Sequence, residues 1–296
     1  MQATQTVAAV NRFQGKIPTA LLKKIWRSTF GSDVDRFFPT DEIELECIQP
    51  YGFLKFTPAS GGDAEFYRSL MRRRGYSSPN KAEFREAAQW TAPGEKVLDV
   101  GCGIGNFSVL CRGEYRGVET NPGAVEDAAK LGRNVHQGFV EDEEQGSFDV
   151  VTVFQVLEHV DDPVSFLKAC VGCVRPGGRI ILSTPDVDGV MGYAVNEILN
   201  YPPHHLTWWS ETSLRAILKD HQCEVTEAWS EPLQGMHLRL LLSALFWPRR
   251  EKHFTSSILY HIANFGFRVL GRIARRSWIE VPFVRGHTVM VMATKK

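Results

Sequence analysis

Three glycines that alternate with other residues, Gly101, Gly103 and Gly105, follow a short apolar run and are the clearest sign of chemistry in the sequence. Alternating glycines let a backbone turn sharply and approach a ligand closely, because no β-carbon stands in the way. Asp99 precedes them, and Glu119 lies twenty residues after Asp99. A carboxylate there is placed to accept hydrogen bonds from the two hydroxyls of a ribose. The pattern favours a nucleotide-type ligand over its structural alternative, a simple tight turn.

The spacing of these glycines also argues against one kind of nucleotide. A dinucleotide-binding loop reads GxGxxG and would place its third glycine at position 106, where this chain has Asn106. A nicotinamide-dependent oxidoreductase is therefore the less favoured interpretation of the loop.

Two groups of histidines are candidates for acid–base chemistry, because histidine titrates near neutral pH. His159 lies in "LEHV", and His204 and His205 lie in "YPPHHLTWW". Each group follows a predicted strand at the edge where such folds build their sites. For His159, a packing role and a functional role weigh equally. For His204 and His205, the aromatic, proline-rich loop favours function as a general base.

Strands and helices alternate from about residue 96 onward, which predicts a parallel sheet with helices on both faces. Right-handed crossovers would bring the carboxyl ends of the parallel strands to one edge. The predicted strands lie within 96–101, 115–120, 134–140, 147–160, 175–186, 223–232 and 287–296. Helices are expected after the glycines and within 123–132, 162–173 and 210–222. Before residue 90 the pattern indicates helices, within 18–30 and from 78, and a short strand and turn within 51–62.

The segment "VLDVGCGIGNFS" resembles motif I of the class I S-adenosylmethionine-dependent methyltransferases. The similarity continues in family order through "GVET", "FDVVTVFQVLEHVDDP" and "RPGGRIILSTPD", from about residue 64 to 230 and in the final strand, and is closest to the type 11 and type 23 methyltransferase domains. It implies an α/β, Rossmann-like, seven-stranded and mostly parallel sheet with the last strand antiparallel. It also implies S-adenosylmethionine as the cofactor.

The resemblance divides the chain into four parts. These are an N-terminal helical extension or lid (1–90), a cofactor-binding core (91–230), a basic amphipathic helical insertion (231–284) and a final core strand (285–296).

The resemblance also implies cofactor contacts. The glycines would pass beneath the amino-acid and ribose parts, with Asp99 near the amino group and Glu119 on the ribose hydroxyls. The full set is Asp99, Gly101, Cys102, Gly103, Gly105, Asn106, Glu119, Thr120, Asn121, Val140, Glu141, Gln155 and Val156. Thr120 and Asn121 would border the adenine, and Val140 and Glu141 would contact its edge. Gln155 and Val156 would lie beside the methionine part. The family more often has an aspartate near the end of the third strand, where this chain has Glu141 followed by Asp142.

A metal-independent reaction is expected, although Glu158, His159 and a loop histidine could still form a metal site. Some related methyltransferases carry an ExxEH group for a divalent cation, but here Gln155 stands in the position of the first carboxylate, before Glu158 and His159. The CxxC of Cys170 and Cys173 lies in a helical pattern and has no second pair to complete a zinc site. Scattered cysteines without a disulfide framework indicate a reduced, cytoplasmic protein.

The resemblance predicts an O-methyltransferase with His205, His204 or His159 as the general base. N- or C-methylation on the same fold and a non-catalytic cofactor-binding subunit are the alternatives. The acceptor is expected to be a small molecule, a glycan or a lipid-linked metabolite. The 34 basic residues balance 34 acidic ones, so no nucleic-acid partner is expected. Oligomeric state stays open.

Residues 238–278 hold eight basic residues and one acidic residue, with apolar residues at helical spacing. This segment has three interpretations: a solvated lid or dimer surface, a peripheral contact with the inner membrane surface, or a lid for an acidic acceptor. A lid with a phosphate or lipid role is slightly favoured. Its most apolar run, Leu238–Trp247, is about half the length that spans a membrane.

Overall fold

The computed structural model describes residues 16–71, 80–194, 197–233 and 285–296, together with the single residues 237, 242, 265, 266 and 269. The chain divides into two compact units. The core unit comprises Asp63–Thr184, Ser213–Trp229 and Met290–Lys296, and the accessory unit comprises Met1–Gly62, Pro185–Thr212 and Ser230–Val289.

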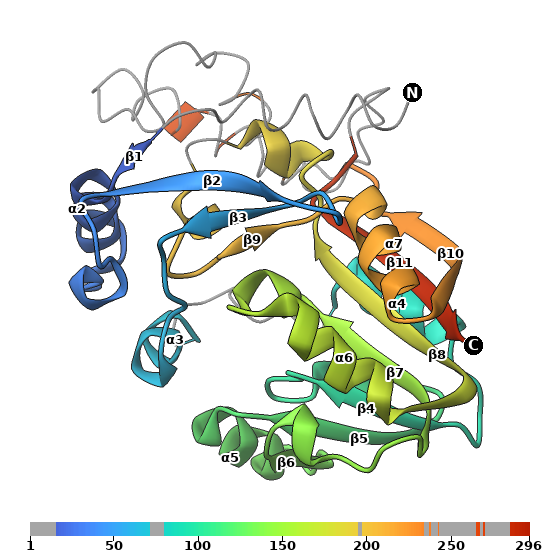
Figure 1. Cartoon of the computed structure of the whole chain (residues 1–296). Helices are drawn as coiled ribbons and strands as arrows, with labels where there is room; N and C mark the ends of the chain where they lie inside the picture. Colours follow the sequence, from blue (N-terminus) through green and yellow to red (C-terminus); the bar gives the residue numbers. More distant parts are fainter. Residues whose placement is uncertain are drawn as a thin grey trace. The chain divides into compact units, whose positions relative to one another are not determined.

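The core unit is built on a seven-stranded sheet in the order β10-β11-β8-β7-β4-β5-β6 (Figure 1). Neighbouring strands from β8 to β6 pair in parallel. The last strand runs the other way, since Nζ of Lys295 near its end donates to the carbonyl oxygen of Val174 at the start of β8. The strands are β4 Lys96–Val100, β5 Glu114–Glu119, β6 Val135–Gln137, β7 Phe148–Phe154, β8 Val174–Pro185, β10 Cys223–Ser230 and β11 Thr288–Lys295. The predicted fold class is confirmed.

Helices connect these strands, and capping residues fix where two of them begin. The helices are α3 Ala64–Met71, α4 Ala82–Gln89, α5 Pro122–Lys130, α6 Pro163–Cys173 and α7 Glu211–Asp220. Asn121 accepts from the N–H of Gly123 at the start of α5, and Asp162 accepts from the N–H of Ser165 at the start of α6. Each cap is followed by a proline, which has no N–H to leave unpaired in the first helical turn.

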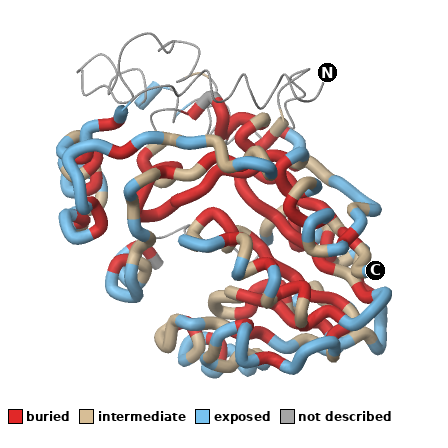
Figure 2. Tube along the Cα trace, in the orientation of Figure 1, coloured by how far each residue is buried: buried red, intermediate tan, exposed pale blue. Residues whose placement is uncertain are grey.

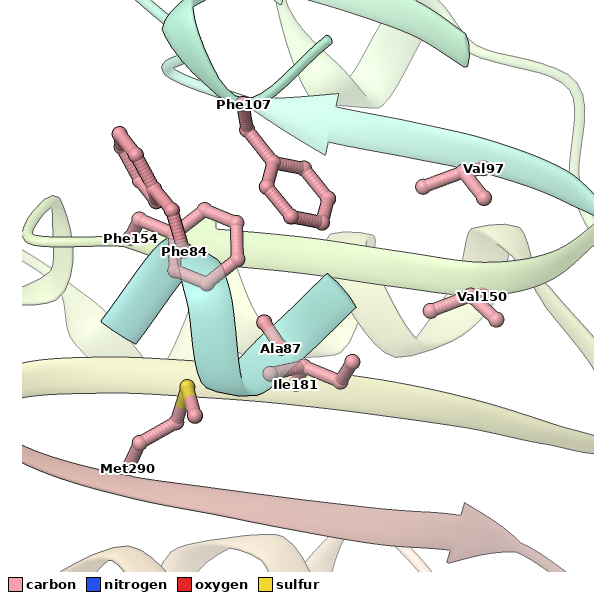
Figure 3. Close-up of a cluster of buried hydrophobic side chains, with 8 residues drawn as sticks. All are labelled: Phe84, Ala87, Val97, Phe107, Val150, Phe154, Ile181 and Met290. Carbon is pink, nitrogen blue, oxygen red and sulfur yellow. The ribbon is translucent and has the colours of Figure 1, made fainter. Parts of the chain in front are cut away.

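Aromatic packing joins the start of the core unit to its sheet. Figure 3 shows the buried cluster, which consists of Phe84, Ala87, Val97, Phe107, Val150, Phe154, Ile181 and Met290. Ring centroids of Phe84 and Phe154 lie 5.1 Å apart, and those of Phe107 and Phe154 lie 4.9 Å apart. Each such ring contributes about 1.5–3 kcal/mol by burial. The cluster therefore fixes α4, the segment after the glycines and the end of β7 against one another.

Most residues of the central strands are buried (Figure 2), and because successive side chains point to opposite faces, both faces of these strands are covered. Val97 and Val150 are paired in register on the face that carries the aromatic cluster. Their neighbours Leu98 and Val151 point to the opposite face and are equally buried. This double burial explains the nearly continuous apolar sequences of β4 and β7. Cys170 and Cys173 on α6 are buried free thiols.

The accessory unit contains a four-stranded sheet in the order β1-β2-β3-β9, in which each neighbouring pair of strands is antiparallel. Its elements are β1 Ile17–Pro18, α2 Thr19–Phe30, β2 Glu42–Ile48, β3 Phe53–Thr57 and β9 Thr207–Trp208. Its core is aromatic: Phe53 stacks on Trp209 with ring centroids 4.3 Å apart, and Phe56 packs edge-on against Trp208.

Two features differ from the elements expected from the sequence. The N-terminal region has the expected helix and strand, but it also forms β2, whose charged and apolar residues alternate along the strand. The helix expected after the glycines is only a 3₁₀ turn, Asn106–Val109, because β5 already begins at Glu114.

The domain boundaries remain a prediction. No helix in the described part of the chain is long and apolar enough to cross a membrane.

The connection from β10 to β11 closes through a narrow neck at Glu231 and Gly286. The N–H of Gly286 donates to the carbonyl oxygen of Glu231 at 2.7 Å. The N–H of Glu231 in turn donates to the carbonyl oxygen of Thr288 at 2.8 Å. A β-carbon at Gly286 would lie 2.7 Å from the carbonyl oxygen of Glu231, so only glycine fits. The basic insertion departs and returns through this neck, and apart from isolated residues it lies outside the described part of the chain.

Arg285, the residue before the neck glycine, lies among three carboxylates of the accessory unit. Its guanidinium nitrogens are 3.3 Å from Asp186, 3.8 Å from Asp188 and 3.8 Å from Glu211. Asp186 is fully buried, and this burial raises its pKa to about 6 despite the neighbouring guanidinium. Arg285 therefore fixes the return of the chain into β11 and supplies the positive charge nearest to a buried acid.

Candidate functional site

The glycine loop between β4 and β5 is closed at its two ends and open in the middle. Gly101, Gly103 and Gly105 all have positive φ, at 65°, 56° and 69°. A β-carbon at Gly101 would lie 2.6 Å from Cγ2 of Val156, and one at Gly105 would lie 2.8 Å from Cγ2 of Val135. A β-carbon at Gly103 would meet nothing within 4 Å. The two outer glycines are needed for packing, and Gly103 presents bare backbone to open space.

Glu119, half-buried at the end of β5, is held against this loop. One carboxylate oxygen accepts from the N–H of Gly103 at 2.8 Å, and the other accepts from the N–H of Asn121 at 2.8 Å. The hydroxyl of Thr120 lies 3.4 Å from the second oxygen. A carboxylate offers about four lone-pair positions, so these bonds orient Glu119 and leave acceptor capacity for the hydroxyls of a ligand.

The far end of the loop is clamped by Arg133, which the sequence did not mark. Its Nη1 donates to the carbonyl oxygen of Ile104 at 2.7 Å and to Oδ1 of Asn106 at 2.9 Å. Asn106 is buried, and its bond to Arg133 anchors the loop. A solitary arginine after α5 carries no local pattern, which is why only the structure reveals this contact.

Asp99 lies beneath the loop and bonds to its own sheet. Thr152 donates to one carboxyl oxygen and Tyr115 to the other, each at 2.8 Å. Burial is the largest cause that raises its pKa, to about 7. Cys102 donates to the carbonyl oxygen of Gly103, and burial raises the pKa of its thiol far above neutrality. Neither thiolate chemistry nor a permanently charged Asp99 is expected here.

The segment after β6 carries an aromatic residue that the sequence analysis missed. Phe139 is 61% exposed, and the N–H of Gly138 just before it donates to the carbonyl oxygen of Glu119. The next residues, Val140 and Glu141, begin a 3₁₀ turn with Val140 buried and Glu141 exposed. The sequence pattern places Phe139 inside the expected strand 134–140, so its exposure is evident only from the structure, in which β6 ends at Gln137.

The turn after β7 is strained. Gln155 has φ of +57°, a left-handed conformation that costs a non-glycine residue of order 1 kcal/mol or more. Its N–H donates to the carbonyl oxygen of Ser183 at 2.9 Å, which holds it in place. The strained turn directs the next residue, Val156, onto Gly101. Strain of this kind concentrates at functional sites.

His159 follows that turn in the core unit. Its Nδ1 lies 3.1 Å from the hydroxyl of Tyr67 on α3, and the two rings pack edge to face. Its Nε2 lies 3.9 Å from a carboxyl oxygen of Glu158. These neighbours fix the orientation of the imidazole. A fixed orientation is required of a group that transfers a proton, and it is equally typical of a histidine that only packs.

His204 and His205 lie in the accessory unit and stack on each other, with ring centroids 4.5 Å apart. Nδ1 of His204 lies 2.7 Å from the carbonyl oxygen of Leu199, and Nδ1 of His205 lies 3.1 Å from Oδ1 of Asn200. Each Nδ1 donates, so Nε2 carries the lone pair of the neutral ring. The structure brings these two predicted histidines together.

A family model described as a methyltransferase domain matches residues 68–228. A ubiquinone biosynthesis O-methyltransferase of Xanthomonas campestris is 39% identical over 110 residues, which are 33% of this chain and 46% of that protein. One of Ralstonia nicotianae is 39% identical over 153 residues, 44% of this chain and 63% of that protein.

The match therefore spans only about half of the length of such relatives. Among solved structures, a SAM-dependent methyltransferase of Archaeoglobus fulgidus is similar in fold, with a TM-score of 0.52 and 19% identity over 77% of this chain and all of that one.

Proposed function

The chain belongs to the family of methyltransferase domains within the class I S-adenosylmethionine-dependent methyltransferases, and from that membership we propose that it methylates a hydroxyl group of a small molecule. The observation that carries the proposal is the open backbone of Gly103, bonded to the carboxylate of Glu119. Together they form a cradle that a β-carbon would fill, beside an acceptor for a ribose.

The residues present fit S-adenosylmethionine. Glu119 would accept from the ribose hydroxyls, and the ligand would pass over Gly103. The ring of Phe139 offers a face for the adenine, with Val140 beside it. The cofactor supplies a methyl group already activated on a sulfonium, so the protein's main tasks are to align the acceptor and to accept its proton.

The sequence around the cradle separates this ligand from a dinucleotide. Asn106 stands where a dinucleotide loop has its third glycine, and its side chain is engaged by Arg133. Titration calorimetry with S-adenosylmethionine and with NAD tests the assignment. Binding of the first and not the second is expected, and the reverse result would remove the proposal.

A histidine is the base that hydroxyl methylation requires near neutral pH. His205 and His204 are the first candidates, because the bonds at Nδ1 leave Nε2 as the basic nitrogen. His159, bonded to Tyr67, is the third candidate. N- or C-methylation is the alternative on this fold. An acceptor atom that is already deprotonated would not need a histidine as base.

The curated relatives act, by their names, in ubiquinone biosynthesis, which supports a small-molecule hydroxyl acceptor over a glycan. A lipid-linked acceptor also fits this chemistry. The basic segment 238–278 would then face an acidic group of the acceptor or a membrane surface, and its role stays a prediction because it lies almost wholly outside the described residues.

Methyl transfer to a panel of phenols, sugars, sugar nucleotides and lipid-linked hydroxyl compounds tests the function directly. His205→Ala and His204→Ala should leave S-adenosylmethionine affinity unchanged and lower turnover by about 10²-fold or more for the residue that acts as the base. His221→Gln, in the turn between α7 and β10, is the matched control and should keep full turnover. If neither loop histidine affects turnover, the assignment of the base to this loop is wrong.

A further inference from the structure

The loop that carries His204 and His205 is held in place by other residues of the accessory unit. Nε1 of Trp26 on α2 donates to the carbonyl oxygen of Pro202 at 2.8 Å. The backbone N–H groups of His204 and His205 both donate to the carbonyl oxygen of Tyr201, at 3.1 and 3.2 Å, and Tyr201 is fully buried. The backbone of the two histidines is therefore fixed independently of their side-chain contacts.

Asn200, the last residue of the 3₁₀ turn Ile198–Asn200, connects this framework to His205. Its carbonyl oxygen accepts from Nε1 of Trp208 at 2.7 Å, and its N–H donates to the carbonyl oxygen of Glu197 at 2.9 Å. Asn200 is 3% exposed, and its Oδ1 lies 3.1 Å from Nδ1 of His205. Burial of an amide is costly unless it is hydrogen-bonded, so the ring of His205 also satisfies the side chain of Asn200.

This bond determines which nitrogen of His205 carries the proton. A side-chain amide oxygen only accepts, so Nδ1 of His205 donates to it and Nε2 keeps the lone pair. A neutral imidazole without such a partner exchanges between two tautomers, and only one of them leaves Nε2 basic. An amide selects that tautomer without adding a negative charge, whereas a carboxylate would favour the protonated ring.

His204 makes the matching bond to the backbone instead. Its Nδ1 lies 2.7 Å from the carbonyl oxygen of Leu199, an acceptor that every residue type at position 199 would supply. The rings of His204 and His205 stack with their centroids 4.5 Å apart, so a proton on one ring disfavours a proton on the other. The asparagine at position 200 thus acts on one ring of the pair, that of His205.

We propose that Asn200 is the positioning residue of the general base: it holds His205 as the Nδ1–H tautomer, so that Nε2 of His205 takes the proton of the acceptor hydroxyl. The inference rests on the proposed function and assigns the base to His205 rather than to His204. The acceptor oxygen forms its bond to the methyl carbon as the methyl–sulfur bond breaks, and the electron pair of that bond stays on sulfur. The hydroxyl proton passes to Nε2, the bond to Asn200 stabilises the charge on the ring, and the proton later leaves to solvent.

The tautomer can be measured without any need for activity. Long-range proton–nitrogen correlation spectra of protein labelled with ¹⁵N-histidine distinguish the two tautomers by the shifts of the ring nitrogens. With neutral rings, wild-type His205 should be the Nδ1–H tautomer, its signals identified by their loss in His205→Gln. Asn200→Leu should move His205 toward the Nε2–H tautomer. His204 should stay as Nδ1–H, because its acceptor belongs to the main chain.

Turnover tests the catalytic part of the inference, with an acceptor found in the panel described above. Asn200→Leu should lower kcat by about tenfold or more, because a hydrogen bond to a developing charge is lost, and should change KM for the acceptor by less than about threefold. Asn200→Asp keeps an oxygen acceptor for Nδ1 and should restore the tautomer and most of the lost turnover.

Thr207→Val is the matched control. It removes another buried hydrogen bond of the same loop, from Nε1 of Trp209 to Oγ1 of Thr207 at 2.8 Å, and should change neither the tautomer of His205 nor kcat. Thermal unfolding of each variant measures any loss of stability. The wild-type spectrum needs no variant of Asn200, so it tests the inference even if Asn200→Leu fails to fold.

The inference is overturned if wild-type His205 is the Nε2–H tautomer, or if Asn200→Leu leaves tautomer and kcat unchanged. It is also overturned if Thr207→Val lowers kcat as much as Asn200→Leu does. Loss of turnover in His204→Ala but not in His205→Ala overturns it too, and leaves the proposed function intact. A wild-type chain that shows the expected tautomer but methylates no acceptor of the panel would instead refute the proposed function.

Discussion

Replacing two glycines of the same loop by alanine should separate ligand approach from packing. Gly103→Ala and Gly105→Ala both place a side chain at positive φ, which costs an L-residue about 1–2 kcal/mol. Only the β-carbon at position 105 meets a neighbour, Cγ2 of Val135 at 2.8 Å, and such overpacking costs about 1–3 kcal/mol more. The free energy of unfolding should fall by about 1–2 kcal/mol for Gly103→Ala and by about 2–5 kcal/mol for Gly105→Ala.

Ligand affinity should show the opposite order. The methyl group at position 103 enters space that the structure leaves open, where the cofactor is proposed to pass, so S-adenosylhomocysteine affinity should fall by about tenfold or more. At position 105 the methyl group points into the protein, and affinity should fall less. Urea unfolding and calorimetric titration measure the two effects on the same samples.

The double variant Gly105→Ala with Val135→Ala provides the control. Removing the valine methyl groups relieves the overlap, so the double variant should lose less stability than the sum of the two single variants. The reasoning is refuted if Gly103→Ala binds S-adenosylhomocysteine as tightly as the wild type. It is also refuted if Gly103→Ala destabilises the protein more than Gly105→Ala.

Two further predictions concern buried acids. Burial holds the pKa of Asp99 at about 7, above its unfolded value of 3.8, so the folded state binds more protons and stability falls as pH rises between about 4 and 7. Asp99→Asn should flatten this dependence in thermal unfolding between pH 5 and 7, and an unchanged slope would contradict the assigned pKa. Arg285→Met should cost about 3–5 kcal/mol, because it leaves Asp186 buried beside Asp188 without its cation. The double variant with Asp186→Asn should recover part of that loss in urea unfolding.

Local sequence patterns were enough to predict most of the fold and part of the candidate site. The buried strands of the sheet could be inferred because β4 and β7 are apolar on both faces, and the loop could be identified because glycines at 101, 103 and 105 are needed for its backbone conformation. Glu119 was predictable because its distance from the loop along the chain reflects one strand, one turn and one crossover.

Contacts across the sheet could not be predicted, because they depend on register. Arg133 reaches the glycine loop, and Tyr115 and Thr152 reach Asp99, only after β4, β5 and β7 are aligned. The left-handed backbone of Gln155 also has no sequence signal, since glutamine rarely adopts it.

The neck at Glu231 and Gly286 closes the connection between β10 and β11 through the backbone. Its two hydrogen bonds join main-chain atoms, so they do not require particular side chains in the residues that the neck encloses. The entropic cost of a longer or shorter enclosed segment changes only slowly with length. A change in the length of the chain between residues 231 and 286 should therefore leave the pairing of the last strand nearly unaffected.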